Sequence, residues 1–265
     1  MIKTVCLLIC TQPFLLQADR APLDLPAPYA GIELYPLQPD GWYGNEDYLQ
    51  AVISHYSVQT VVEVGSWLGL STQDIAKRLP AGTGKVFAVD HFLGSIEHQN
   101  VPYLPKLYDI FLSNMVQWEV AHIVVPVRMD SALAAVYLEG TSVDLVYLDA
   151  SHDTESVLAD MRAWWPYVKG HGVLCGDDAT WPSVQAAVKI FAQEHDLKAY
   201  LSGNFWHLFE YRTPLQNLLN SNRLSYEKKL AGSSYRVLYK ADPPFLDDMQ
   251  ITLDVWWRLP EIDWE

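Results

Sequence analysis

The chain has 265 residues, half of them hydrophobic, and a formal net charge of −14. That length and hydrophobicity allow one domain with a substantial buried core plus appendages, while the negative charge opposes nucleic-acid or anionic-membrane partners. The three cysteines, Cys6, Cys10 and Cys175, are too few for a disulfide framework or a zinc ligand set.

Residues 1–40 form an N-terminal arm that is first apolar and then proline-rich. Lys3, the apolar stretch Thr4–Leu16 and Ala18 have the order of a secretory signal over residues 1–18, although an apolar arm packed on the domain fits equally well. The apolar run is too short to span a bilayer. We therefore predict no integral membrane span and a cytoplasmic protein, or a secreted or periplasmic one if residues 1–18 are cleaved.

From Trp42 onward, strand and helix patterns alternate. Asn45 is a predicted helix cap, and Ser71 with Asp74 has the spacing of a capping box. The expected helices are 45–55, 71–79, 104–118, 131–138, 154–168 and 183–195, and the expected strands are 60–64, 85–89, 123–127, 143–148 and 172–175.

The last part of this region predicts a hairpin. Leu197–Leu201 and Phe205–Tyr211 read as strands separated by Ser202-Gly203-Asn204. The regular alternation before them predicts right-handed crossovers. We therefore expect an α/β fold with a doubly wound, mostly parallel seven-stranded sheet that ends in a C-terminal antiparallel hairpin.

Small residues follow the first strand where the backbone must turn into a helix. The loop from Glu63 to Thr72 contains Gly65, Ser66 and Gly69, which permit close approach to a ligand, but it lacks the G-x-G-x-x-G spacing of a pyrophosphate loop. Asp90 ends the second strand, where a carboxylate can accept both hydroxyls of a ribose.

Acidic residues also end two later strands. Asp149 follows Val143–Leu148, and Asp177 with Asp178 follows Gly172–Gly176. The carboxyl ends of parallel strands meet at one edge of the sheet, so these three carboxylates should converge. Oxygen ligands of this kind suit a hard divalent cation such as magnesium or manganese.

Between Trp42 and Arg212 the chain resembles the class I S-adenosylmethionine-dependent methyltransferases. The motifs are Glu63-Val64-Gly65-Ser66 through Gly69, Val89-Asp90, Asp130-Ser131, Leu148-Asp149-Ala150-Ser151-His152 and Gly176-Asp177-Asp178. The resemblance implies S-adenosylmethionine as cofactor, a methyltransferase domain over residues 41–212, and a terminal hairpin. It also implies a set of cofactor-binding residues: Glu63, Gly65, Ser66, Gly69, Asp90 and Asp130.

Within that class, the chain is similar to metal-dependent O-methyltransferases, above all those that act on macrolide sugars. This likeness implies that Asp149, Asp177 and Asp178 bind the metal, which we expect to be magnesium, and that His152 is the general base. A divalent ion lowers the pKa of a coordinated hydroxyl, and a nearby imidazole can take its proton.

Each of these residues also has a structural interpretation. Asp177 and Asp178 fit the start of the helix that follows, Glu63 fits a helix cap, and Asp149 fits an ion pair, although no cation is near it in sequence. His152 fits a loop residue that hydrogen-bonds to the backbone.

Beyond Arg212 the resemblance ends. Residues 213–265 form an acidic, tryptophan-rich extension with a predicted helix at Leu215–Leu219 and a predicted strand at Tyr235–Tyr239. Because it carries Trp256, Trp257 and Trp264, we expect it to pack on its own domain as a lid or on a second copy in a homo-oligomer.

The sequence therefore predicts an enzyme that transfers a methyl group from S-adenosylmethionine to a hydroxyl of a sugar or small natural product. Two alternatives remain. One is a catalytically silent methyltransferase-like binding module, exported if residues 1–18 are a signal. The other is a nucleotide-binding oxidoreductase, which would need a third glycine in the first loop and leaves the later acids unexplained.

Overall fold

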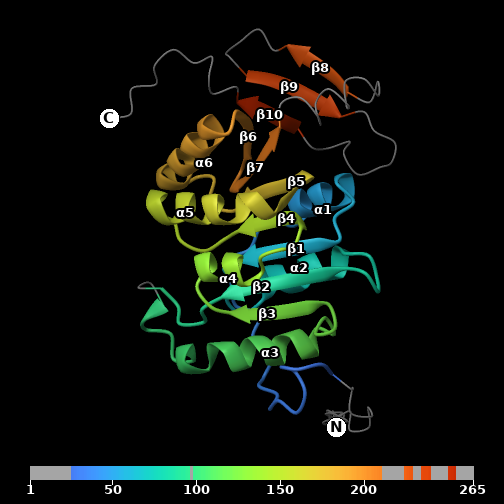
Figure 1. The fold of residues 1–265 in the computed structure, drawn as a ribbon, viewed down its shortest axis with the longest axis vertical. Coiled ribbons are helices and arrows are strands. Elements are labelled where there is room, and N and C mark those ends of the chain that lie inside the picture. Colours follow the sequence, from blue (N-terminus) through green and yellow to red (C-terminus); the bar gives the residue numbers. More distant parts are fainter. Residues whose placement is uncertain (1–24, 96–97, 211–223, 229–233, 240–249, 255–265) are drawn as a thin grey trace, which may run out of the picture.

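The computed structural model describes residues 25–95, 98–210, 224–228, 234–239 and 250–254. A seven-stranded sheet forms its centre, with strand order β3-β2-β1-β4-β5-β7-β6 (Figure 1). The strands β1 to β5 are parallel, and β7 and β6 add an antiparallel hairpin to the β5 edge. Their bounds are β1 Thr60–Val64, β2 Lys85–Asp90, β3 Val124–Arg128, β4 Val143–Leu148, β5 Val168–Gly176, β6 Leu197–Ser202 and β7 Phe205–Glu210. The predicted fold class is confirmed.

Six α-helices connect and cover these strands: α1 Glu46–His55, α2 Leu70–Arg78, α3 Leu107–Gln117, α4 Ser131–Tyr137, α5 Thr154–Trp164 and α6 Pro182–Glu194. Short 3-10 turns, η2 Leu104–Lys106 and η3 Trp165–Tyr167, precede α3 and follow α5. The predicted helix 154–168 therefore ends earlier than expected, because Pro166 cannot continue the α-helical hydrogen bonds.

The sheet is apolar on both faces because β-strand side chains alternate. Val61 and Leu145 pack in one core with α1, α2 and α3, whereas their neighbours Val62 and Val146 pack in the other core with α4, α5 and α6. Figure 1 shows α4, α5 and α6 together on one side of the sheet. This doubly covered arrangement explains why β4 is buried at every position.

The predicted capping box at Ser71 and Asp74 is wrong. Helix α2 begins at Leu70 after Gly69, which has φ +86°, so both residues lie within the helix. Ser71 is buried, and Asp74 accepts hydrogen bonds from Tyr43 and Arg78. The turn is made by a left-handed glycine, and the two polar side chains are left to make tertiary contacts.

The described part of the proline-rich lead-in crosses α3. Asn114 of α3, fully buried, exchanges hydrogen bonds with the backbone of Gln38 and also donates to the carbonyl of Leu68 in the loop after β1. Tyr29 is buried and donates to the carbonyl of Val124. Through Asn114 the lead-in is connected to the loop after β1, and through Tyr29 it is connected to β3.

A second, antiparallel sheet has the order β10-β9-β8, with β8 Leu224–Lys228, β9 Ser234–Tyr239 and β10 Gln250–Asp254. It lies at the β6 end of the main sheet, where β10 is beside β6 (Figure 1). The predicted strand at 235–239 is confirmed by β9. The predicted helix at 215–219, Trp256, Trp257, Trp264 and residues 1–24 lie outside the described residues.

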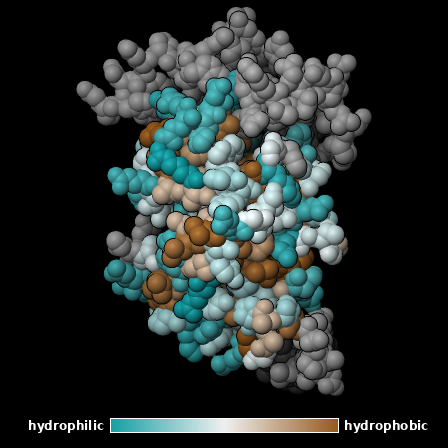
Figure 2. Space-filling model, viewed as in Figure 1, coloured by the Kyte–Doolittle hydropathy of each residue, from teal (hydrophilic) through white to brown (hydrophobic). Residues whose placement is uncertain are grey.

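Polar residues cover most of the face shown in Figure 2, interrupted by smaller hydrophobic areas. Within the described ranges, no helix has both the length and the apolar character needed to cross a membrane.

Candidate active site

The predicted site residues come from the carboxyl ends of neighbouring strands. Glu63 is in β1, Asp90 ends β2, Asp149 follows β4 and Asp177 follows β5. Since these four strands are parallel and adjacent, their ends share one edge of the sheet.

Glu63 is completely buried and does not cap the following helix. Its Oε2 accepts hydrogen bonds from the hydroxyls of Ser66 (2.8 Å) and Thr72, while Oε1 has no hydrogen-bond partner among the described residues. Burial raises its pKa, and the surrounding hydroxyls only partly oppose that change. One carboxylate oxygen is thus held in place and the other remains available for a ligand's donor.

Gly65 makes the closest approach within the loop after β1. It has φ +93°, and a Cβ atom there would lie 1.9 Å from the carbonyl oxygen of Asp149. Gly69 is also constrained, since its Cβ would lie 2.2 Å from the Met115 side chain. Only glycine allows this loop to pack directly against the chain that carries Asp149.

Asp90 organises the same loop through its carboxylate. Oδ2 accepts the backbone N–H of Trp67 at 2.9 Å, and Oδ1 accepts the backbone N–H of Phe92 at 2.6 Å. Each carboxylate oxygen has further acceptor capacity, so Asp90 remains suitable for a diol as well as for loop positioning.

Asp130 has a different setting. It is exposed, and its Oδ1 caps α4 by accepting the backbone N–H groups of Ala132 (3.0 Å) and Leu133 (3.4 Å). The structure does not bring it into the group of acids around Asp149. Its predicted contact near adenine stays a prediction.

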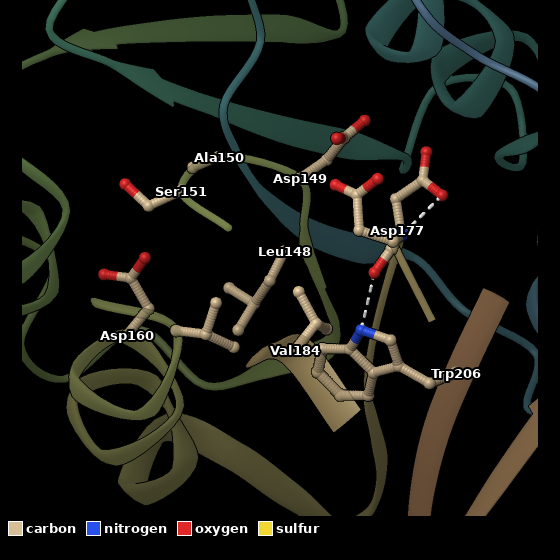
Figure 3. Close-up of a pocket in the computed structure, with 10 residues that line it drawn as sticks. Leu148, Asp149, Ala150, Ser151, Asp160, Asp177, Val184 and Trp206 are labelled. Atoms are coloured by element: carbon tan, nitrogen blue, oxygen red, sulfur yellow. Dashed lines mark hydrogen bonds between the residues drawn. The ribbon is translucent and has the colours of Figure 1, made fainter. Parts of the chain in front are cut away.

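Asp149 and Asp177 line one pocket together with Asp178 (Figure 3). Burial, followed by the charges of Asp177, Asp178 and Glu63, raises the pKa of Asp149 well above its usual range. No hydrogen bond among the described residues involves the Asp149 carboxylate. This group therefore requires a proton or a positive charge nearby when its neighbours are ionised.

Asp177 is buried, and burial with the adjacent Asp178 charge raises its pKa. Hydrogen bonds from the Asp178 backbone and from the Asn45 and Asn204 side chains partly oppose that rise. Helix α6 starts at Pro182 with Trp181 as its N-cap, so neither aspartate caps it. The helix-start interpretation of Asp177 and Asp178 is therefore wrong.

His152 contacts one of the three acids directly. Its Nε2 is 3.0 Å from Oδ2 of Asp178, and its ring stacks on Trp181 with centroids 4.8 Å apart and an interplanar angle of 23°. The imidazole is thus held between a carboxylate and an aromatic ring. This is an arrangement in which a carboxylate can fix the tautomer of a histidine base.

Four residues of this site were not identified from the sequence: Asn45, Asp160, Trp181 and Asn204. Asn45 is buried before α1 and donates to the Tyr147 hydroxyl. Asp160 of α5 lines the pocket, where burial raises its pKa to about 6. Asn45, Asp160 and Trp181 follow no strand end, and Asn204 lies in the hairpin turn after β6, so their positions in the fold reveal them.

The donor types at this site fit a hard divalent cation. Three carboxylates repel one another, and the one ion pair that the described residues supply to them is His152 with Asp178. Nevertheless, no group of three or more His, Cys, Asp or Glu side chains is arranged to hold a metal ion within the described ranges. The chemistry of the residues fits an ion, while their side-chain positions are not those of an assembled ligand shell.

Comparison with known proteins agrees with the fold. Residues 62–179 match the family model of a methyltransferase domain. No curated protein matches the sequence.

Solved structures with the same fold share little sequence. The O-methyltransferase from Bacillus cereus in complex with SAH is 17% identical, with a TM-score of 0.51 and 65% of this chain and 83% of that chain covered. TomG from Streptomyces achromogenes, an O-methyltransferase involved in tomaymycin synthesis and solved with SAM, is 15% identical, with a TM-score of 0.50 and coverages of 64% and 80%. Cofactor-bound Rv0187 from MTB is 17% identical, with a TM-score of 0.52 and coverages of 70% and 83%.

These structures establish the fold, and the family model identifies the domain that carries Glu63, Asp90 and Asp149. Residues 62–179 thus match a methyltransferase domain, and the chain has the fold of solved O-methyltransferase structures that bind SAM or SAH.

Proposed function

We propose that this protein transfers the methyl group of S-adenosylmethionine to a hydroxyl of a sugar or small natural product, with a divalent cation beside the acceptor. The observation that carries the proposal is the packing of Gly65 on the backbone of Asp149, where no side chain could fit. This contact places the loop expected to bind S-adenosylmethionine directly beside the acidic pocket. A methyl donor and an acceptor hydroxyl would therefore lie next to each other.

In this proposal the loop after β1 and the end of β2 bind the methyl donor. The free Oε1 of Glu63 is suited to the ammonium group of the methionine moiety, because a buried carboxylate oxygen without a partner favours a charged donor. Asp90, held by two backbone N–H groups, is suited to the ribose hydroxyls. Gly65, Ser66 and Gly69 keep the loop close to the substrate.

Asp149, Asp177 and Asp178 would hold the cation, for which magnesium is our first expectation. When bound, such an ion lowers the pKa of an alcohol oxygen and neutralises the repulsion among the three carboxylates. The acids themselves would fix the acceptor's position through the ion they hold. The ion is the part of the proposal that depends on donor chemistry alone.

His152 would act as the general base. With Nε2–H directed to Oδ2 of Asp178, its Nδ1 is the nitrogen that can accept the proton of an acceptor hydroxyl, and Asp178 then stabilises the imidazolium. The acceptor oxygen forms a bond to the methyl carbon as the carbon–sulfur bond breaks, leaving S-adenosylhomocysteine. Most of the rate enhancement would come from holding the two substrates in line.

The acceptor class is supported by chemistry and by one structural relative. TomG, which has the same fold, is an O-methyltransferase involved in tomaymycin synthesis. A hydroxyl acceptor suits a pocket of carboxylates beside an imidazole, because the imidazole can receive the hydroxyl proton. We place the reaction in the cytoplasm because S-adenosylmethionine is normally available there.

Calorimetric titration tests this function. S-adenosylhomocysteine should bind the purified protein saturably in the presence of a chelator, and magnesium should give a separate binding heat in the chelator-free protein. The magnesium heat should disappear in Asp149→Ala while the S-adenosylhomocysteine affinity stays within a few-fold of wild type. Failure of S-adenosylhomocysteine to bind under either condition would reject the methyltransferase function, whereas an unchanged magnesium heat in the variant would reject the ion site.

A further inference from the structure

We propose that Asn204, in the turn between β6 and β7, is a positioning residue that holds Asp177 and Asp178 together at the proposed cation site. This inference rests on the proposed function, because it concerns the same ion site. It adds a residue from the terminal hairpin, 27 positions beyond Asp177 in the chain.

The orientation of the Asn204 amide is set by Thr180. The Oδ1 of Asn204 accepts the Thr180 hydroxyl at 2.7 Å and the Thr180 backbone N–H at 3.4 Å. Its backbone carbonyl accepts the N–H of Ala179 at 2.9 Å. With donors on the oxygen side, the NH2 group must be the side that faces the acids.

The NH2 group of Asn204 reaches both aspartates. Nδ2 donates to Oδ1 of Asp177 at 2.5 Å and lies 3.4 Å from Oδ1 of Asp178. The backbone N–H of Asp178 donates to the same Asp177 oxygen at 2.7 Å. Two N–H donors thus use Oδ1 of Asp177, and the Asn45 side chain donates to the same carboxylate. Of these donors, the Asn204 amide is the one that also reaches the side chain of Asp178.

The loop that Asn204 holds has a costly backbone conformation. Asp178 has φ +61°, a region that residues with a Cβ atom seldom occupy. Trp206 of β7 adds a second restraint, because its indole N–H donates to the carbonyl of Asp177 at 2.8 Å (Figure 3). The hairpin therefore supplies the contacts that keep two like charges adjacent in a strained loop.

The test is manganese binding, measured from the loss of the electron paramagnetic resonance signal of free Mn²⁺ on titration with protein. Asn204→Ala should weaken manganese binding by about tenfold, which corresponds to about 1.4 kcal/mol. Thr180→Val, which removes one restraint on the amide, should weaken it by a smaller factor. Ser202→Ala is the matched control, because Ser202 is in the same hairpin but its hydroxyl bonds Tyr48. Equal manganese affinity in Asn204→Ala and wild type would overturn the inference.

A second measurement separates this inference from the proposed function. In metal-free protein, hydrogen exchange of the segment 176–181 should be faster in Asn204→Ala than in wild type and unchanged in Ser202→Ala. If wild type binds no manganese yet the variant exchanges faster, the ion site is wrong and the positioning of the acids by Asn204 stands. If exchange in that segment is equal, Asn204 does not position the acids. Unchanged S-adenosylhomocysteine affinity would show that each variant is folded.

Discussion

Asp90 holds the loop after β1 and is also the proposed ribose-binding residue, so one substitution affects both. Its carboxylate accepts the backbone N–H groups of Trp67 and Phe92, and it is the expected partner of the ribose. Asp90→Ala should weaken S-adenosylhomocysteine binding by about 1.5 to 3 kcal/mol, the loss expected when charge-assisted hydrogen bonds are removed. Asp90→Asn, which keeps the size and one acceptor oxygen, should lose less. Calorimetry measures both, and wild-type affinity in the alanine variant would place the ribose elsewhere.

Asp160 should make the stability of the protein depend on pH. Burial raises its pKa from 3.8 to about 6, so the folded state disfavours its ionised form. For an acid whose pKa is raised on folding, stability is greatest below the unfolded pKa and is lost as pH rises through the folded pKa. From well below pH 4 to well above pH 6 the total loss due to this one residue should be roughly 3 kcal/mol.

Asp160→Asn removes that titration and keeps an acceptor for the Ser131 hydroxyl, which lowers the Asp160 pKa in the wild type. We therefore expect the variant to be more stable than wild type at pH 7.5, with little difference at pH 4. Urea unfolding at both pH values measures the two differences. A difference that does not change between them would show that Asp160 titrates normally.

At the scale of elements, the turn between β1 and α2 requires glycine for two reasons. Gly65 has positive φ and also lies against the backbone of Asp149, whereas Gly82 has φ +80° with nothing within 4 Å of its added Cβ. Gly82→Ala should therefore lower the free energy of unfolding only by the backbone strain of an alanine at positive φ, about 1 to 2 kcal/mol. Gly65→Ala should cost several kcal/mol more and separate the loop from Asp149.

Thermal unfolding and S-adenosylhomocysteine titration of the two variants measure this comparison. Gly82→Ala should bind like wild type, while Gly65→Ala should lose binding or fail to fold. Similar stability of both variants would mean that the loop can move away from β4 without loss of folding free energy. The close contact between Gly65 and Asp149 would then no longer support the proposed function.

The sequence predicts most strands of the main sheet well because their signals are local, although β5 begins at Val168 and not at Gly172 as predicted. The buried run Val143–Leu148 is β4 at the predicted bounds. In the terminal hairpin, Ser202 belongs to β6, which leaves Gly203 and Asn204 as the turn, and β7 is Phe205–Glu210. Gly203 has φ +58°, as the first turn position of a two-residue hairpin can require. Continuous apolar runs and turn residues are visible in a few neighbouring positions.

The sequence predicts those residues of the site that directly follow strands of the parallel sheet. The rule that parallel strands end at one edge identifies Asp149 and Asp177. It cannot identify Asn204 or Trp181, whose roles come from the turn of the hairpin and the start of α6 reaching the same place. The capping-box prediction failed at Ser71 because α2 begins one residue earlier, at Leu70, after the left-handed Gly69.

At the scale of the whole molecule, a bound ion should stabilise the fold. Magnesium at a hundredfold excess over its dissociation constant should add about 2.7 kcal/mol, a rise in Tm of roughly 5 to 10 °C for a domain of this size. Asp149→Ala should show no such rise. Sodium chloride at matched ionic strength is the control, because a chain of charge −14 also gains stability from simple screening. Equal shifts in wild type and variant would indicate screening alone.

The strand order β5-β7-β6 has a consequence for the protein as it leaves the ribosome. In the main sheet β6 pairs with β7 alone, and β7 joins β5, so β6 is synthesised before the strand that connects it to the sheet. Until β7 follows, the edge of β5 is open and Asp177 and Asp178 lack Asn204. The loop after β1 can meet Asp149 some 55 residues of synthesis earlier. A nascent chain should therefore acquire the ability to retain S-adenosylhomocysteine before it acquires an ordered acidic pocket.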